Sequence, residues 1–133
     1  KENVLRTAEK YDTDKGKWIK LEDMSTPRRA ATSVIMPEGI YVLGGYDGNS
    51  YLKSCERFDF NTKKWKSIPS MNYNKSHFSC NVSQNCNYLY TIGGFDGKSL
   101  NLVERYDVFT GKWEVVCKLP GNKYRHQSIL IQE

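Results

Sequence analysis

The residues best suited to acid–base or metal chemistry are two histidines, His77 and His126, and each stands at the start of a strand-like segment. A neutral imidazole can take up a proton or bind a metal ion. The chain supplies neither a serine nucleophile elbow nor an HExxH helix to accompany them. We therefore expect no enzyme, no catalytic residue and no cofactor. The two rings would lie near one axis if their segments are equivalent, so an enzyme with a metal site remains a remote alternative.

Two further patterns suggest a metal, and neither fits. The loop at residues 12–18, DTDKGKW, resembles a calcium loop, but its glycine comes one residue early for an EF-hand. The four cysteines include no CxxC pair, and no histidine stands at ligand spacing from the close pair Cys80 and Cys86. We expect no metal, and free thiols, as in a protein of a reducing compartment, the cytoplasm.

The elements that position these residues are short strands separated by turns. In residues 40–65, the run IYVL has strand-type side chains and ends at the pair Gly44-Gly45. Turn residues YDG follow, then the alternating segment CERFDF, and then Trp65, which begins another short strand.

The same sequence pattern occurs again in the chain. Trp18, Trp65 and Trp113 lie 47 and 48 residues apart, and the glycine pairs begin at Gly44 and Gly93. A period near 50 residues with one glycine pair and one Trp indicates propeller blades or a solenoid. The recurring positions, which we interpret as structural, are Tyr11, Trp18, Gly44, Gly45, Glu56, Arg57, Phe58, Trp65, Gly93, Gly94, Glu104, Arg105, Tyr106 and Trp113.

These motifs resemble the kelch repeat. The resemblance covers almost the whole chain, although the first copy has Lys10 in place of the arginine and lacks the glycine-pair strand. It implies an all-β fold of kelch-type β-propeller blades, each a four-stranded antiparallel sheet. The family's rings usually have six blades, and often close by sharing one blade between early and late strands.

Blade boundaries follow from the repeat. Residues 1–24 are predicted to be the outer strands of one blade, with strands at 3–12 and 18–21. Residues 25–71 and 72–120 are predicted to be complete blades. Residues 121–133 are predicted to supply the inner strand of a further blade, at 126–131. The result is an incomplete propeller of about 2.8 blades and eleven strands, which we expect to self-associate or to need the missing blades.

Composition agrees with this class. Hydrophobic residues make up 38% of the chain and aromatic residues 13%, and no apolar run is long enough to cross a membrane. A net charge of +5 permits contact with polyanions, but no aromatic and basic pattern of a nucleic-acid module is present. We expect a protein or an acidic peptide as partner, with neither membrane nor nucleic acid.

An antiparallel meander places the loops on two rims. One rim carries Lys15, Lys17, Lys63, Lys64 and Lys112. The other is the candidate partner-binding rim, with Arg28, Arg29, Asp47, Asn49, Lys75, His77, Asp96, Lys98, Arg125 and His126. We expect Arg57 and Arg105, inside strands, to be structural, and Arg28 and Arg125 to be exposed, with Lys75 at the matching place of the middle blade. In kelch propellers the matching arginine helps to line a pocket for a partner peptide, often an acidic one.

Two functions remain open under this resemblance. The first is substrate recognition by a BTB-kelch-type adaptor of a cullin ubiquitin ligase. The second is an actin-binding or cytoskeletal kelch protein. We also expect the three tryptophans to be largely buried between blades.

Overall fold

The structure, a computed structural model, describes residues 3–131, and within them ten strands form and no helix does. The first sheet pairs β1 (Glu9–Asp12) with β2 (Lys17–Lys20). The second consists of β3 (Thr32–Met36), β4 (Gly39–Leu43), β5 (Cys55–Asp59) and β6 (Lys64–Ile68), in that order. The third consists of β7 (Ser79–Val82), β8 (Tyr88–Ile92), β9 (Leu100–Asp107) and β10 (Lys112–Lys123), also in chain order.

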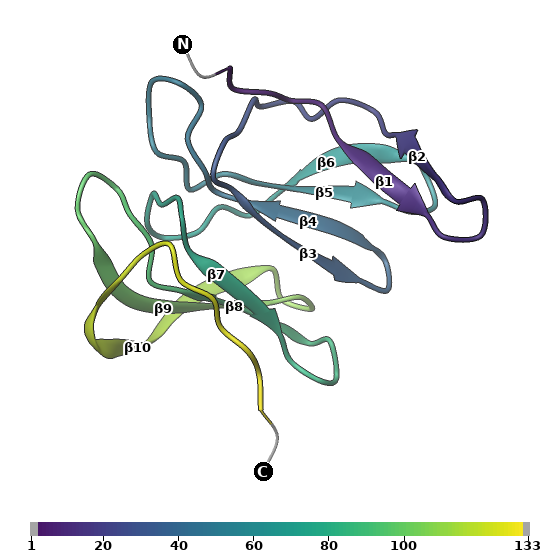
Figure 1. The fold of residues 1–133 in the computed structure, drawn as a ribbon. Coiled ribbons are helices and arrows are strands. Elements are labelled where there is room, and N and C mark those ends of the chain that lie inside the picture. The colour runs from purple at the N-terminus through teal and green to yellow at the C-terminus, as the bar shows by residue number, and fades with distance from the viewer. Residues whose placement is uncertain (1–2, 132–133) are drawn as a thin grey trace.

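The sheets follow one another as the blades of a propeller do. Figure 1 shows the β1–β2 hairpin at one end, the β3–β6 sheet in the middle and the β7–β10 sheet at the other end. Every strand pair is antiparallel, and the inner strands β3 and β7 contact each other. The predicted fold class, an incomplete propeller of four-stranded antiparallel blades, is confirmed.

The glycine pairs are required because the linker to the next sheet passes directly over them. Gly45 donates its N–H to the carbonyl oxygen of Lys75 at 2.9 Å, and Gly94 donates to that of Lys123 at 2.7 Å. A Cβ on Gly44 would lie 2.5 Å from the Lys75 oxygen, and one on Gly93 would lie 2.4 Å from the Lys123 oxygen. All four glycines also have positive φ, so a larger residue would be strained as well as crowded.

The apolar core lies between the two complete sheets. Tyr41 and Leu43 of β4 and Leu89 of β8 are almost fully buried there, with Met71 and Phe78 from the connecting segment. Such burial contributes on the order of 1.5–3 kcal/mol per large side chain. All four cysteines have free thiols, and burial raises the pKa of Cys55 to about 11 and that of Cys80 to about 12.

Two expected strands differ in the structure. Residues 126–131 were predicted to form an eleventh strand, and this is wrong, since they form no backbone ladder and contact β7 through the side-chain bonds Ser79–His126 and Asn81–Ser128. A strand needs backbone hydrogen bonds to a neighbouring strand, and this segment makes none with any described strand. At the other end, β1 starts at Glu9 rather than at residue 3, with only an isolated bridge from Leu5 to Arg28 before it.

The expectation that all three tryptophans are largely buried is also wrong. Trp65 and Trp113 are half-buried, and each donates its indole N–H to a backbone oxygen just beyond the outer strand of the preceding repeat. The acceptors are Glu22 at 2.5 Å and Pro69 at 2.9 Å. Trp18 is 66% exposed, because no preceding outer strand lies beside it within the described residues.

We predict that Trp65→Ala lowers the free energy of unfolding by about 2–3 kcal/mol, below the range for a fully buried Trp. The loss combines the packing of the ring on Phe58, 5.3 Å between centroids, with the indole hydrogen bond to Glu22. Chemical denaturation of the two proteins measures it. Phe109→Ala, at a side chain that is 81% exposed, should change stability by no more than about 0.5 kcal/mol. Equal effects of the two substitutions would contradict this role for Trp65.

Candidate partner-binding site

Three linker residues at equivalent repeat positions share an unusual backbone conformation. Ala30, His77 and Arg125 have φ values of 51°, 52° and 52°. The His77 N–H donates to the Ala30 oxygen at 3.0 Å, and the Arg125 N–H donates to the His77 oxygen at 2.9 Å. A left-handed non-glycine residue costs on the order of 1–2 kcal/mol, and such strain is common at binding sites. The three linkers therefore form one continuous strip across successive sheets.

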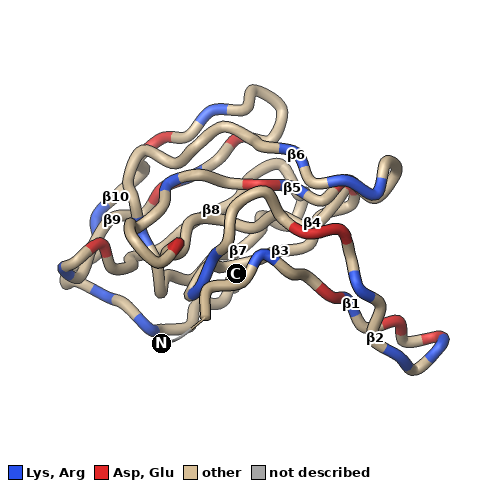
Figure 2. Tube along the Cα trace, turned by 90° about the horizontal axis from the view of Figure 1, so that it is seen from above, with Lys and Arg blue, Asp and Glu red and all other residues tan. Residues whose placement is uncertain are grey.

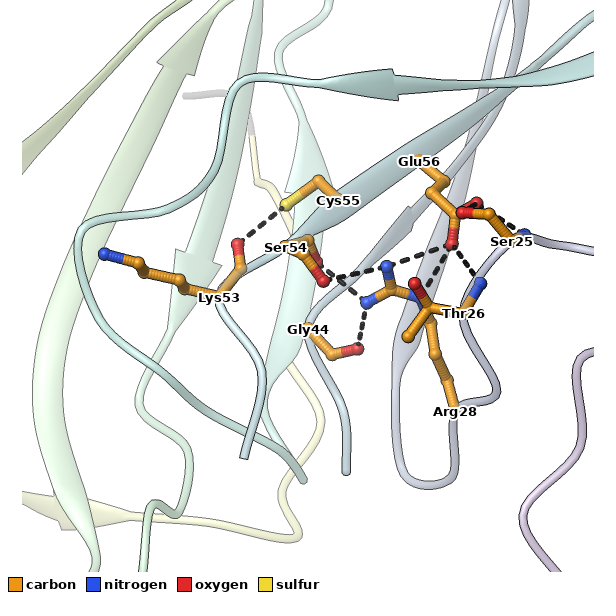
Figure 3. A network of polar contacts seen from close by, with 8 residues as sticks. All are labelled: Ser25, Thr26, Arg28, Gly44, Lys53, Ser54, Cys55 and Glu56. Atoms are coloured by element: carbon orange, nitrogen blue, oxygen red, sulfur yellow. Dashed lines mark hydrogen bonds and ion pairs between the residues drawn. The ribbon is translucent and has the colours of Figure 1, made fainter. Parts of the chain in front are cut away.

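Two positions before each residue of the strip stands a basic residue of the same linker. The basic residues of the first two linkers are buried. Arg28 contacts Glu56 of β5 at 3.0 Å, with side chains 1% and 2% exposed. Figure 3 shows the guanidinium of Arg28 also directed at Gly44 and Ser54, whose carbonyl oxygens it reaches at 2.8 Å each. Ser25 donates its N–H and hydroxyl to the same carboxylate. Burial raises the pKa of Glu56, but the hydrogen bonds from Ser25 and Arg28 outweigh it and lower the pKa overall.

The middle linker repeats this arrangement with lysine. Lys75 Nζ lies 2.6 Å from a Glu104 carboxylate oxygen and donates to Thr91 Oγ1 at 2.7 Å, and both charged side chains are fully buried. Asn72 donates its N–H to Glu104, as Ser25 does to Glu56. Burial lowers the pKa of Lys75, and Glu104 offsets part of that effect.

These contacts correct the expected roles of two rim cations. Arg28 and Lys75 were predicted to be partner-binding residues and Arg28 to be exposed. That exposure is wrong, because both side chains are enclosed beside the glutamate of their own sheet's third strand. A signal for the pairing is present in the sequence: the glutamate follows the cation by 28 residues in one repeat and 29 in the next.

Two strand arginines bond within their own sheets. Arg57 contacts Asp59 at 3.4 Å and lies over the Tyr41 ring. Arg105 contacts Glu114 and lies over the Tyr88 ring, 4.5 Å from its centroid.

The candidate site is a cleft on the strip, with a volume of about 280 Å³. Its wall is a chain of aromatic rings in which Tyr46 meets Tyr51, Tyr51 meets Phe95 and Phe95 meets Tyr124, at centroid distances of 5.1, 5.7 and 5.3 Å. Its remaining lining residues are Arg29, Ser76, His77 and Arg125.

Two cations and one histidine give the cleft its polarity. The guanidinium of Arg29 lies 4.9 Å from the Tyr46 ring centroid, and that of Arg125 lies 5.9 Å from the Tyr124 centroid. Burial and the charges of Arg125 and Arg29 lower the pKa of His77, so its imidazole is neutral at pH 7. The arrangement suits a ligand that brings both an anionic and an apolar group.

A second hollow, of about 480 Å³, lies next to the cleft and extends along the inner strands β3 and β7. It shares His77 and Arg125 with the cleft and includes His126, whose Nε2 lies 3.0 Å from Ser79 Oγ. Burial lowers the pKa of His126. Within residues 3–131, no cluster of three or more His, Cys, Asp or Glu side chains is arranged to hold a metal ion.

The remaining predicted site residues lie away from the cleft. Asp47 and Asp96 accept backbone N–H groups of their own turns, from Asn49 and Ser50 in the first case and from Lys98 in the second. Asn49 and Asp96 line another hollow, which shares Tyr51 with the cleft, and Lys98 is exposed.

The aromatic wall was not predicted, although the sequence carries a signal for two of its residues. Tyr46 and Phe95 each directly follow a glycine pair. Tyr51 and Tyr124 have no comparable repeat signal.

The fold and this rim define a repeat protein built from propeller blades, and the comparisons with known proteins name the repeat. Residues 27–72 and 77–119 match the Kelch motif. The chain therefore belongs to the kelch-repeat family. This membership supports a protein-interaction module.

Three relatives illustrate the match. A RING finger domain and kelch repeat-containing protein of Dictyostelium discoideum is 31% identical over 64% of this chain and 8% of its own length. Kelch-like protein 41a of Danio rerio is 34% identical over 64% of this chain and 14% of its own. Kelch repeat protein C2 of Vaccinia virus is 30% identical over 82% of this chain and 21% of its own. The chain thus spans less than a quarter of the length of these relatives. No helix among the described residues has the length and apolar character to cross a membrane.

We predict that Arg28→Met destabilises the fold by about 3–5 kcal/mol, because it leaves the Glu56 charge buried without its partner. The double variant Arg28→Met/Glu56→Gln should recover about 1–3 kcal/mol of that loss. Denaturant unfolding of wild type, both single variants and the double variant gives the coupling. Lys98→Met, at an exposed side chain, is the matched control. Strictly additive effects would show that the two side chains do not interact.

Proposed function

We propose that this chain recognises an acidic segment of a protein partner in the rim cleft, and that it does so as the substrate-binding part of a BTB-kelch-type adaptor of a cullin ubiquitin ligase. One observation carries the first half of the proposal. The linker strip brings Arg29, His77 and Arg125 to a cleft whose wall is aromatic. Two guanidinium groups beside apolar rings favour a carboxylate next to an apolar side chain.

The polarity of the cleft supports an acidic ligand over a basic one. The titratable side chains among the described lining residues are two cations, one neutral imidazole and three phenols. Asp47 and Asp96, the nearest carboxylates in sequence to Tyr46 and Phe95, are engaged with backbone N–H groups of their turns. Among residues 3–131, the cleft therefore offers a basic peptide no carboxylate to pair with.

Nucleic acid is the less favoured partner. Figure 2 shows Lys and Arg positions interspersed with Asp and Glu positions along the sheets and turns. Binding to a phosphate backbone depends on many cations acting together on one surface. The cleft offers two guanidinium groups, which suits a short anionic segment better.

The adaptor role rests on the family assignment and on the relatives. One relative combines kelch repeats with a RING finger domain, and two others are named as kelch-like or kelch repeat proteins. In each of these relatives the segment that matches this chain is a small part of a longer protein. The free thiols support a reducing compartment, and we place the protein in the cytoplasm.

We predict that Arg125→Glu weakens binding of the partner at least tenfold, which corresponds to about 1.4 kcal/mol. The substitution replaces a donor at the cleft with a repelling carboxylate. The full-length protein is used to capture partners, the captured protein is identified, and its acidic segments are made as peptides for titration. Lys64→Glu, on the opposite rim, is the matched control and should bind as wild type does.

Three outcomes would contradict the proposal. Loss of binding with Lys64→Glu and not with Arg125→Glu would place the partner on the lysine rim. Equal weakening by both, with a steep dependence on salt, would indicate a non-specific polyanion. Co-sedimentation with actin filaments, without co-capture of a cullin by the full-length protein, would favour the cytoskeletal alternative.

A further inference from the structure

A polar hollow, here called the outer hollow, lies beside the cleft and outside the site that the proposed function uses. Its volume is about 490 Å³. It is lined by side chains of the loop between β4 and β5, by Asn72, Tyr73 and Asn74 of the linker between β6 and β7, and by Asp96 of the loop between β8 and β9. These elements belong to the two complete sheets and to the linker that joins them.

The outer hollow and the cleft are continuous. Tyr51 lines both, and its ring packs between those of Tyr46 and Phe95 in the aromatic wall. The same linker also lines both, with residues 72–74 in the outer hollow and residues 76–77 in the cleft. The two hollows are therefore successive parts of one trough that follows the linker.

The linker residues of the outer hollow form an arch whose two ends are fixed. Met71 donates its N–H to the carbonyl oxygen of Lys53 at 3.0 Å. Lys75 donates its N–H to the carbonyl oxygen of Leu52 at 3.0 Å, and its side chain is held by the buried pair with Glu104. An arch that is fixed at both ends loses little conformational freedom when a ligand binds to it.

This arch carries backbone donors that the first linker lacks. Tyr73 and Asn74 stand where the first linker has Thr26 and Pro27. The Thr26 N–H donates to the buried carboxylate of Glu56 at 3.4 Å, and proline has no N–H to donate. Within residues 3–131, by contrast, the N–H groups of Tyr73 and Asn74 have no hydrogen-bond partner. Unpaired backbone N–H groups beside a hollow can donate to the carbonyl oxygens of an extended ligand.

The side chains of the outer hollow offer amide groups and a balanced charge. Asn49, Asn72 and Asn74 are exposed, and each contributes one amide. An amide has an acceptor oxygen and two donor hydrogens, which are the kinds of groups that pair with a peptide main chain. The charge of Lys53 is balanced by the carboxylate of Asp96. The outer hollow therefore suits a neutral main chain, whereas the two guanidinium groups of the cleft suit an acidic side chain.

We propose that the partner segment is extended and longer than the cleft, and that the outer hollow binds its main chain. The proposal rests on the proposed function, which places an acidic residue of the segment in the cleft. From there the segment passes Tyr51 and follows the linker, where the asparagine amides and the N–H groups of Tyr73 and Asn74 bond to its backbone groups. A segment that follows residues 72–77 in extended form has about six residues. Its acidic residue determines specificity, and its main chain adds affinity.

Backbone methylation of the ligand tests the outer hollow separately from the cleft. The probe is a synthetic peptide that covers the acidic segment of the captured partner, titrated against the full-length protein. In a series of such peptides, one main-chain N–H at a time is replaced by N–CH3. Methylation at one or more residues outside the acidic residue and its apolar neighbour should weaken binding about tenfold, because it removes a backbone donor. Replacing the side chains of the same residues with that of alanine should change the affinity by about threefold or less.

The double variant Asn72→Ala/Asn74→Ala gives the complementary measurement on the protein. It should weaken binding of the whole segment about tenfold, because two amides are lost from the outer hollow. It should leave unchanged the affinity of a shortened peptide that keeps the acidic residue and its apolar neighbour. Arg125→Glu should weaken binding of both peptides. Asn61→Ala, at an exposed asparagine of the opposite rim, is the matched control and should bind both peptides as wild type does.

The outcomes distinguish this inference from the proposed function. If Arg125→Glu leaves both peptides unaffected, the proposed function fails, and this inference fails with it. If Arg125→Glu weakens both peptides while neither methylation nor the asparagine variant affects the longer one, the cleft alone binds the partner and only this inference is overturned. Equal weakening of the longer and shorter peptides by the asparagine variant would also overturn it. If thermal melting shows that the double variant does not fold, the methylation series with the wild-type protein decides.

Discussion

In each of the two linkers that lead into a complete sheet, a cation enters the sheet and meets the third-strand glutamate. Arg28 does so with a full set of partners, since its guanidinium also reaches two carbonyl oxygens. The backbone of the anchored residue can then bond to the neighbouring sheet. The carbonyl oxygen of Lys75 accepts the N–H of Gly45, which belongs to the preceding sheet. The sheets are thereby joined at the rim as well as through the apolar core.

Because of this anchor, the linker residues that hold the fold differ from the linker residues that reach the binding surface. The buried cation is followed by residues that reach the surface, Arg29 and Ala30 in the first linker and, after the buried Ser76, His77 in the next. The residue two positions after the cation has the left-handed conformation in all three linkers, whether it is Ala, His or Arg. Side chains at the rim can thus differ between repeats while the framework stays the same.

The two anchors are not equivalent energetically. Removing a charged pair from water costs several kcal/mol per ion, so such pairs are stable only where further hydrogen bonds complete their shells. The fork of Arg28 is surrounded by acceptors, whereas the ammonium of Lys75 has Glu104 and Thr91. The lowered pKa of Lys75 reflects its burial. The middle linker is therefore held by a less complete set of partners than the first.

The sequence predicted the fold well because its signals are local and repeated. Glycine pairs, the Glu-Arg-aromatic-Asp strands and the tryptophans mark strands, turns and register without knowledge of contacts. The site was predicted less well because burial is not local: Arg28 and Arg29 are adjacent in sequence, yet one enters the sheet and the other lies at the cleft. The similar offset between cation and glutamate in the two repeats, 28 and 29 residues, contains that information. The failure of residues 126–131 to form a strand has the same origin, since a ladder depends on a neighbour.

Hydrogen exchange of individual backbone amides tests the anchoring role most directly. The N–H groups of Ser25 and Asn72 lie in linkers and donate to the buried carboxylates of Glu56 and Glu104, both at 2.8 Å. If the buried pairs hold the linkers, these two amides should exchange as slowly as the amides of β5 and β9. The Asn49 N–H donates at the same 2.8 Å to Asp47 in an exposed turn, and should exchange rapidly. Exchange of Ser25 and Asn72 as fast as that of Asn49 would contradict the account.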